Sequence, residues 1–216
     1  MKKIFLLIFI ILTLLTQVLV ADKKRNILDQ VSENYLKLVP FQLEYLIVQQ
    51  IANDNSIDEA MGEFYLHNKE CFRVNYPGSQ ILYDSTWLWS IDKLNKQIIV
   101  EEFDPRSSLR LIYNVLNGNL SEYKIEKIEN GRTGEEKNQF KVYLKSIKSN
   151  NFFESMIIWI EKGKNEIKKV EYIDFQDNSI TIYFDKYYNH SISNEELFEV
   201  KNITSEDFID LRDQEE

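Results

Sequence analysis

The feature that most constrains the fold is a series of short alternating segments, separated by turn residues, between Gly62 and Phe103. Alternation of apolar and polar residues with a period of two is typical of strands that bury one face. Pro77-Gly78 and the stretch Asp92–Asn95 mark two of the tight turns between them. We therefore predict five antiparallel strands in succession, which excludes a fold built mainly of helices.

The same pattern extends to both sides of this region. Phe41, Leu43, Tyr45, Ile47, Gln49 and Ile51 share one face of a longer first strand. Five more strands are predicted after residue 120, at about 123–128, 140–144, 156–161, 167–175 and 179–187. Apolar residues at helical spacing predict helices over Asn26–Leu38, which ends before Pro40, and over Ser108–Leu116.

Together these elements predict a mainly β fold with a helical lid. Strands at this spacing favour a curved, incomplete antiparallel β-barrel, a half-barrel of about eleven strands. Two helices are too few to cover both faces of such a sheet, so we expect them on its concave side, with the N-terminal helix as part of the lid.

The N-terminus has the three parts of a secretory signal. Lys2 and Lys3 precede the apolar run Ile4–Leu15, and a more polar stretch ends at Ala21. We predict export with cleavage after Ala21, which leaves residues 22–216 as a single domain with an acidic tail, 205–216, expected to be frayed. The alternative is an uncleaved anchor, because the basic residues 23–25 follow the apolar run.

Charge argues against two classes of partner. The chain carries a formal net charge of −9, and loss of Lys2 and Lys3 with the signal would make it −11. Such a domain is a poor match for the phosphates of nucleic acid, and anionic lipid surfaces would repel it. Cys71 is the single cysteine, so no internal disulfide can form.

No catalytic or metal-binding set stands out. The two histidines, His67 and His190, lie in no metal-binding pattern, and the sequence contains no nucleophile elbow or phosphate-binding loop. Carboxylates on neighbouring strands could in principle form a glycosidase pair, but nothing marks one out. We therefore expect a protein that is not an enzyme and has no metal and no cofactor.

Aromatic and branched residues on the strands favour a ligand cavity instead. Some stretches, such as Trp87-Leu88-Trp89 and Met156–Ile160, are apolar on both faces, and an apolar cavity is the usual small-molecule site. The predicted cavity residues are Phe72, Val74, Trp89, Ile99, Val142 and Trp159. A shift of one residue would turn any of them to the other face of the sheet.

The order of the elements resembles the periplasmic outer-membrane lipoprotein carriers (LolA), over roughly Asn26 to Lys201. The matching features are the first helix, the long strand FQLEYLIVQQ, Gly62 opening a strand, Phe72–Tyr76, Gln80–Leu82, Leu88-Trp89-Ser90-Ile91-Asp92 in place of the family's Leu-Trp-x-Tyr-Asp, and the strand–turn–strand Asp174–Phe184.

The resemblance implies a monomeric periplasmic carrier whose concave face holds the acyl chains of lipoproteins. It implies as partners an inner-membrane ABC releasing complex and an outer-membrane acceptor. The alternatives are a lipid- or glycolipid-binding or envelope-sensing domain of the same fold, and an enzyme acting on an envelope lipid or glycan. The missing catalytic sets count against the enzyme.

The sequence departs from the family where a gating arginine is usual. Asn68-Lys69 stands in place of the family's Arg-Pro. We therefore expect the lid to be held by apolar contacts of Leu28, Val31 and Tyr35, not by a charged clamp. Arg73 and Lys69 are the candidates for restoring that clamp.

Overall fold

The structure is a computed structural model that describes residues 27–54, 56–104, 107–120, 122–148, 153–174, 176–189 and 208–212. The predicted signal segment, residues 1–21, lies outside these ranges. Within them, no helix is long and apolar enough to cross a membrane.

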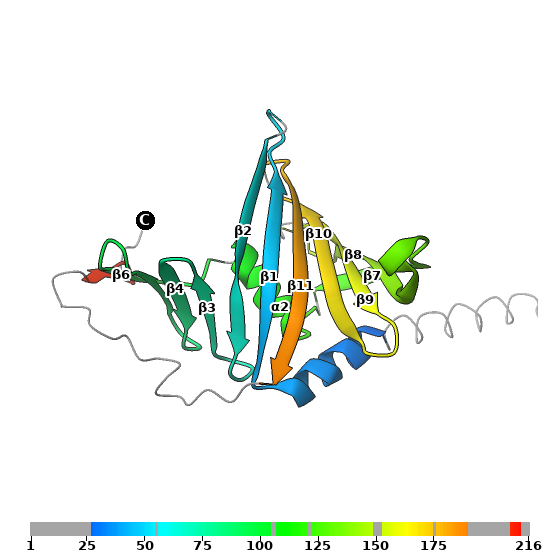
Figure 1. Ribbon diagram of the computed structural model, residues 1–216, viewed down its shortest axis with the longest axis horizontal. Helices are drawn as coiled ribbons and strands as arrows, with labels where there is room; N and C mark the ends of the chain where they lie inside the picture. The colour runs from blue at the N-terminus through cyan, green and yellow to red at the C-terminus, as the bar shows by residue number, and fades with distance from the viewer. Residues whose placement is uncertain are drawn as a thin grey trace, which may run out of the picture.

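The described strands form two successive meanders (Figure 1). The first is β1 (Phe41–Gln50), β2 (Ile57–Leu66), β3 (Phe72–Tyr76), β4 (Ser79–Tyr83), β5 (Leu88–Asp92) and β6 (Gln97–Glu101). The second follows helix α2 (Ser108–Leu116) and is β7 (Tyr123–Asn130), β8 (Gln139–Ser146), β9 (Ser155–Glu161), β10 (Glu166–Ile173) and β11 (Ser179–Asn189). A 3₁₀ turn, Gly134–Asn138, precedes β8.

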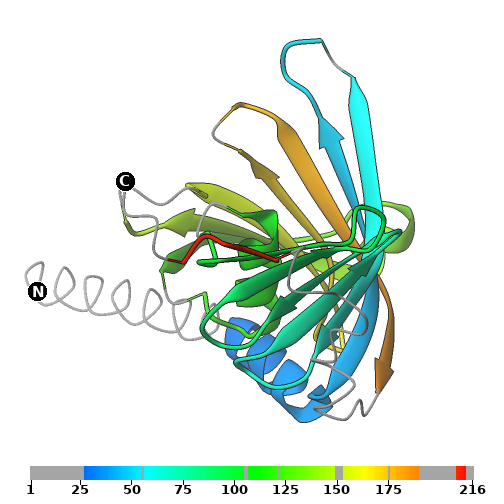
Figure 2. The same cartoon turned by 90° about the vertical axis from the view of Figure 1, so that its left-hand side faces the viewer.

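The twelve described strands make one sheet in the order β12-β6-β5-β4-β3-β2-β1-β11-β10-β9-β8-β7. β1 and β11 pair antiparallel at its centre, from Phe41 opposite Asn189 to Gln50 opposite Ser179. The sheet bends strongly but stays open, with β12 and β7 at its two ends (Figure 2). The prediction of one curved, incomplete barrel is confirmed.

The end of the described chain differs from the sequence expectation. β12 (Phe208–Asp210) lies within the tail predicted to be frayed, and it pairs parallel with β6. The sheet is therefore mixed, not purely antiparallel. The ring of Phe208 lies 6.2 Å from that of Trp89, centroid to centroid, and this contact accompanies the backbone pairing with β6.

Turn chemistry explains why the first meander folds so tightly. Gly78, between β3 and β4, has a φ of +82°, which a glycine adopts without strain. After β5, the Asp92 carboxylate accepts hydrogen bonds from the backbone N–H groups of Leu94 and Asn95, both at 2.9 Å. These local bonds fix a turn of few residues between adjacent strands.

Both helices contribute to one apolar core with the strands. The N-terminal helix, residues 27–38, ends before Pro40 and buries Ile27, Val31 and Tyr35, which are four residues apart. Helix α2 begins and ends at the predicted residues and buries a five-residue face: Leu109, Leu111, Ile112, Val115 and Leu116. We call the sheet face that these helices cover the concave face, and the other the convex face.

Candidate functional site: the concave face and its helices

The concave face carries apolar side chains across most of the sheet. Directly paired residues in a sheet share a face. On one side Val74 pairs with Ile81, which pairs with Ser90, which pairs with Ile99. On the other side an apolar row runs directly across β8, β9, β10, β11 and β1 through Val142, Ile158, Val170, Ile182 and Ile47.

Four of the six predicted cavity residues lie on this face. Phe72, Val74 and Val142 are fully buried in its core, and Ile99 is partly buried. The register therefore brings together residues from both ends of the sheet on a single surface. Whether they touch a ligand stays a prediction.

Trp89 and Trp159 lie on the convex face, opposite to the other four predicted cavity residues. Trp89 pairs with Leu82 and Val100, and its indole N–H donates to Asp84 Oδ2 at 2.9 Å. Trp159 pairs with two lysines, Lys141 and Lys169, one on each neighbouring strand.

The environment of Trp159 explains why an outward tryptophan can be buried. The ammonium groups of Lys141 and Lys169 lie 4.6 and 4.2 Å from its ring centroid, at cation–π distance. Their aliphatic stems cover the indole, which is only 4% exposed. Every neighbour of Trp159 in β9 from Met156 to Ile160 is apolar, so the sequence carried no signal for its face.

The predicted lid residues lie where the N-terminal helix meets the sheet. Val31 and Tyr35 are each 1% exposed, and Leu28 is partly buried against the same core. The apolar contact expected of this helix is therefore present. It is accompanied by hydrogen bonds that the sequence did not predict.

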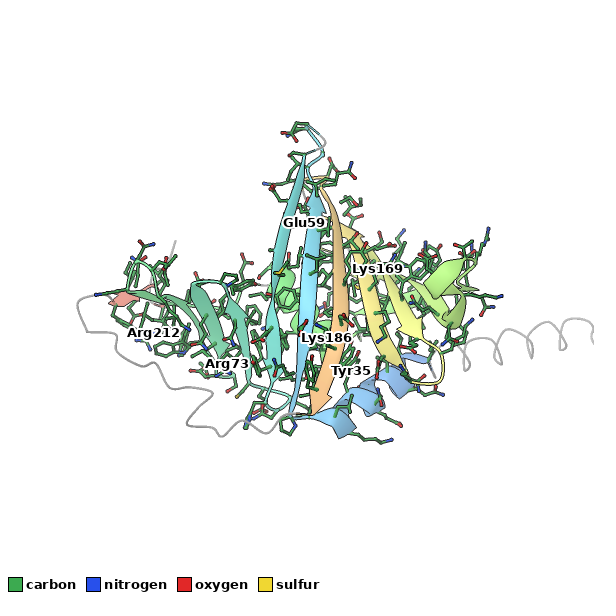
Figure 3. All side chains as sticks on the ribbon, in the orientation of Figure 1. Tyr35, Glu59, Arg73, Lys169, Lys186 and Arg212 are labelled. Carbon is green, nitrogen blue, oxygen red and sulfur yellow. The ribbon has the colours of Figure 1, made fainter. Side chains whose placement is uncertain are left out.

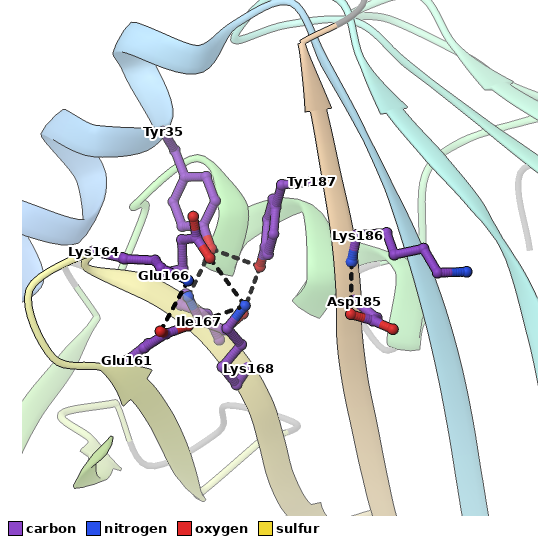
Figure 4. A network of polar contacts seen from close by, with 9 residues as sticks. All are labelled: Tyr35, Glu161, Lys164, Glu166, Ile167, Lys168, Asp185, Lys186 and Tyr187. Carbon is purple, nitrogen blue, oxygen red and sulfur yellow. Dashed lines mark hydrogen bonds and ion pairs between the residues drawn. The ribbon is translucent and has the colours of Figure 1, made fainter. Parts of the chain in front are cut away.

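Tyr35 closes a ring of three hydrogen bonds between the helix, β10 and β11 (Figure 4). The backbone N–H of Ile167 donates to Tyr35 Oη at 2.8 Å. Tyr187 Oη donates to the Ile167 carbonyl, so the proton of the 2.8 Å bond between the two hydroxyls belongs to Tyr35. Burial raises the pKa of both tyrosines, which keeps both hydroxyls protonated and the ring neutral.

A charged cluster borders this ring on the β9–β10 hairpin. Lys168 Nζ lies 3.2 Å from Glu161 and 2.9 Å from Glu166, and Lys164 Nζ lies 3.0 Å from Glu161 (Figure 4). The Lys168 ammonium is also 5.3 Å from the centroid of the Tyr187 ring. These ion pairs hold the strand segment that carries Ile167.

The two candidates for the gating clamp make their described contacts with Tyr65 and with helix α2. Arg73 pairs with Tyr65 and Leu82 on the convex face, and its guanidinium lies 4.5 Å from the Tyr65 ring centroid (Figure 3). Arg73 therefore lies on the face opposite to the helices, and its gating role stays a prediction. Lys69 contacts α2 through its backbone carbonyl, which accepts from Tyr113 Oη and from Asn117 Nδ2, and not through its ammonium group.

Helix α2 is anchored at both ends. At its start, Ser107 Oγ accepts from the Leu109 N–H, and Ser108 Oγ lies 2.8 Å from Tyr172 Oη on β10. At its end, the two bonds to the Lys69 carbonyl tie it to the β2–β3 loop. Burial raises the pKa of Tyr172 to about 12, so this hydroxyl also stays protonated.

Two depressions open among the described residues. One, of about 430 Å³, is lined by residues of β8, β9, β10 and β11 that include Tyr143, Ile157 and Glu171. The other, of about 360 Å³, lies where β2 and β3 separate and includes Tyr45 and Gly62. Beneath the helices, side chains fill the concave face, so a ligand there has to displace a helix.

The described residues hold no group of three or more His, Cys, Asp or Glu side chains that could bind a metal ion. The arrangement instead offers a large apolar surface and a helix attached to it by neutral contacts. That is suited to binding an apolar ligand.

Comparison with known proteins gives the family. The family model for the outer membrane lipoprotein carrier protein LolA matches residues 46–201. A search of curated proteins found no match.

Solved structures share the fold at low sequence identity. A DUF1329 family protein from Desulfovibrio piger aligns with a TM-score of 0.56 at 9% identity, covering 85% of this chain and 99% of that one. A putative outer membrane lipoprotein-sorting protein domain from Vibrio parahaemolyticus gives 0.53 at 11%, covering 82% and 97%. An uncharacterized conserved protein from Thermus thermophilus gives 0.51 at 12%, covering 85% and 98%. With the family match over most of its length, the chain belongs to the LolA family of outer membrane lipoprotein carrier proteins.

Proposed function

We propose that this protein is a periplasmic carrier that holds the acyl chains of lipoproteins between its concave face and its helices. The observation that carries the proposal is the unbroken apolar row from Val142 to Ile47, covered by a helix that neutral contacts attach. In this proposal the protein changes no bond in its cargo, and it passes the cargo from an inner-membrane ABC complex to an outer-membrane acceptor.

The energetics of acyl chains support a carrier with a movable cover. Each buried CH₂ is worth about 0.8 kcal/mol, so a lipoprotein with several chains does not leave a membrane unaided. A carrier has to shield those chains and still release them. A neutral hydrogen-bond ring suits that task, because its net contribution is about 1 kcal/mol per bond, small enough for cargo to displace it.

The first test uses two adjacent residues of β1 that face opposite sides. Ile47 lies on the concave face and Leu46 on the convex face, and both are partly exposed. With a dansyl-labelled fatty acid as the probe, Ile47→Asn should weaken binding by about tenfold, or 1.4 kcal/mol. Leu46→Asn should leave it unchanged. Equal effects of both variants, or no binding by the unaltered protein, would contradict the proposal.

The second test separates a carrier from a lipid sensor of the same fold. The protein purified from the periplasm of its own cell should retain lipoprotein in native mass spectrometry, and should pass it to acceptor vesicles. Retention of a free lipid or glycolipid without transfer would favour a sensing domain. N-terminal sequencing of the same sample should begin at Asp22; recovery of Met1 would favour an anchored protein.

A further inference from the structure

The central β1–β2 hairpin leaves one edge of the sheet unpaired. β2 pairs with β1 along its whole length, from Ile57 to Leu66, but with β3 only from Glu63 to Leu66. Among the described residues no strand pairs with the outer edge of residues 57–62. This part of the hairpin projects beyond its neighbours, as the position of Glu59 in Figure 3 shows. Its unpaired backbone groups are a template for another strand.

The side chains of this edge are exposed, and its two large apolar side chains lie on the same face. Residues 57–61 are all exposed, and Ile57 and Met61, which share the convex face, are 62% and 64% exposed. Met61 continues an apolar row through Leu46 to Tyr183, which are directly paired across β1 and β11. A strand added to β2 would extend this row.

The edge ends at the depression of about 360 Å³ where β3 separates from β2. Tyr45 lies there, only 3% exposed; its nearest polar neighbour is the Tyr76 hydroxyl, and the two do not meet in good hydrogen-bond geometry. A Cβ on Gly62 would lie 2.8 Å from Tyr45 Oη and 2.6 Å from the Asn75 carbonyl oxygen. The hydroxyl thus lies directly beside the edge, where only glycine fits. A buried polar group without a well-placed partner costs free energy, which a ligand donor would recover.

The charges on this edge of β2 indicate which kind of strand could bind there. Asp58 and Glu59 are both exposed, and neither takes part in an ion pair among the described residues. The edge is therefore acidic on both faces. A second copy of the chain would place acidic groups opposite each other, which is unfavourable, whereas basic residues would complement them.

The other long edge of the sheet lacks these properties. β7 carries alternating charges of both signs, Lys124, Glu126, Lys127 and Glu129, and Lys127 pairs with Glu129. Its register also shifts between Ile125 and Lys127. Charges and bulges of this kind discourage pairing at an edge.

We propose that residues 57–62 of β2 are a docking edge for an extended, basic segment of a partner protein, which adds to the sheet as a further strand. Apolar side chains of the segment pack against Ile57 and Met61. Its basic side chains face Asp58 and reach the Tyr45 hydroxyl. Ile57, Glu59 and Met61 lie on the convex face, whereas Asp58 and Tyr45 lie on the same face as Ile47.

The experiment uses a fluorescent peptide of alternating lysine and valine, about eight residues long, which is an ordinary strand length. Hydrogen exchange should show new protection at the amides of residues 57–62 when the peptide is bound. In anisotropy titrations, the double variant Asp58→Lys/Glu59→Lys should lower affinity by about tenfold. A double variant with the same change of charge at exposed sites elsewhere, Glu70→Lys/Glu154→Lys, should lower it less than about threefold.

A second variant tests the depression. Tyr45→Phe removes a hydroxyl that lacks a well-placed partner, so the thermal midpoint should stay the same or rise, while peptide affinity falls by about threefold. Binding of the fatty-acid probe by the single variant Glu59→Lys, which changes only the convex face, should be unchanged, which separates this site from the carrier function.

The proposal is overturned if both double variants weaken binding equally, or if protection appears along β7 or on the concave face. It is also overturned if an aspartate–valine peptide binds equally well. Sedimentation that shows a dimer of this chain, with β2 protected in hydrogen exchange, would replace the partner with self-association.

Discussion

The two helices cover the same core but are attached to it differently. Helix α2 buries five residues and has polar bonds at both ends, to Tyr172 and to the Lys69 carbonyl. The N-terminal helix buries Ile27, Val31 and Tyr35, and its described polar attachment to the sheet is the hydrogen-bond ring at Tyr35. From this difference we predict that α2 belongs to the fixed frame and that the N-terminal helix is the part that opens.

The largest expected effect is a loss of folding stability when a buried side chain of α2, part of the fixed frame, is removed. Ile112→Ala removes a side chain of α2 that is 1% exposed, and should lower the free energy of unfolding by about 2–5 kcal/mol. Urea denaturation measures it. The control Leu94→Ala changes a side chain that is 81% exposed and should stay within about 0.5 kcal/mol. A loss in Ile112→Ala no greater than in the control would mean that α2 is not part of the frame.

A smaller effect should appear at the movable helix. Tyr35→Phe leaves the Ile167 N–H without its acceptor, and should destabilise the attachment by about 1–3 kcal/mol. Amides of residues 27–38 should then exchange faster, and the fatty-acid probe should load and leave faster. Stopped-flow fluorescence measures the rates.

Two control variants sharpen this comparison. Tyr188→Phe removes an exposed hydroxyl whose described hydrogen bond, to Glu44, is 3.4 Å long, and should change neither rate. Ser108→Ala removes the bond of α2 to Tyr172 and should affect stability but not loading. If Ser108→Ala speeds loading as much as Tyr35→Phe does, then both helices move.

The smallest expected effect is a loss of folding stability at acidic pH. Burial alone would raise the pKa of Glu161, but hydrogen bonds from Lys164 and Lys168 hold it below its usual value. A carboxyl with a lowered pKa in the folded state adds stability above its unfolded pKa, and this is lost as the pH falls through the folded value. Unfolding measured between about pH 5 and pH 3 should lose up to about 1 kcal/mol from this group. Glu161→Gln should lack that part of the acid dependence; an unchanged profile would mean that these ion pairs do not hold the hairpin.

Sequence periodicity predicted the faces of some strands and not of others. In β1, Phe41, Leu43 and Tyr45 alternate with polar residues, and all three are buried as expected. Around Trp89 and Trp159 the neighbours are apolar as well, so alternation could not tell the concave side from the convex side. In such strands the face is decided by register with neighbours far away in the sequence.

Sequence patterns could not predict polar contacts between residues that are far apart in the chain. Tyr35 and Tyr187 are 152 residues apart, and nothing local marks either as a partner of the other. The return of β12 to β6 was missed for a related reason, because three residues with one acidic group carry little strand signal. The helix bounds at 27–38 and 108–116 depend on local spacing and on Pro40, and they were predicted closely.

The order of strands has a consequence for how the molecule assembles. Its two meanders are joined, among the described strands, by the pairing of β1 with β11. The first strand to be synthesised therefore has to wait for residues 179–189 before the sheet can close at its centre. Contacts so distant in the chain make folding slow. Until then one side of β1 is an open edge, so during synthesis this strand needs protection from aggregation.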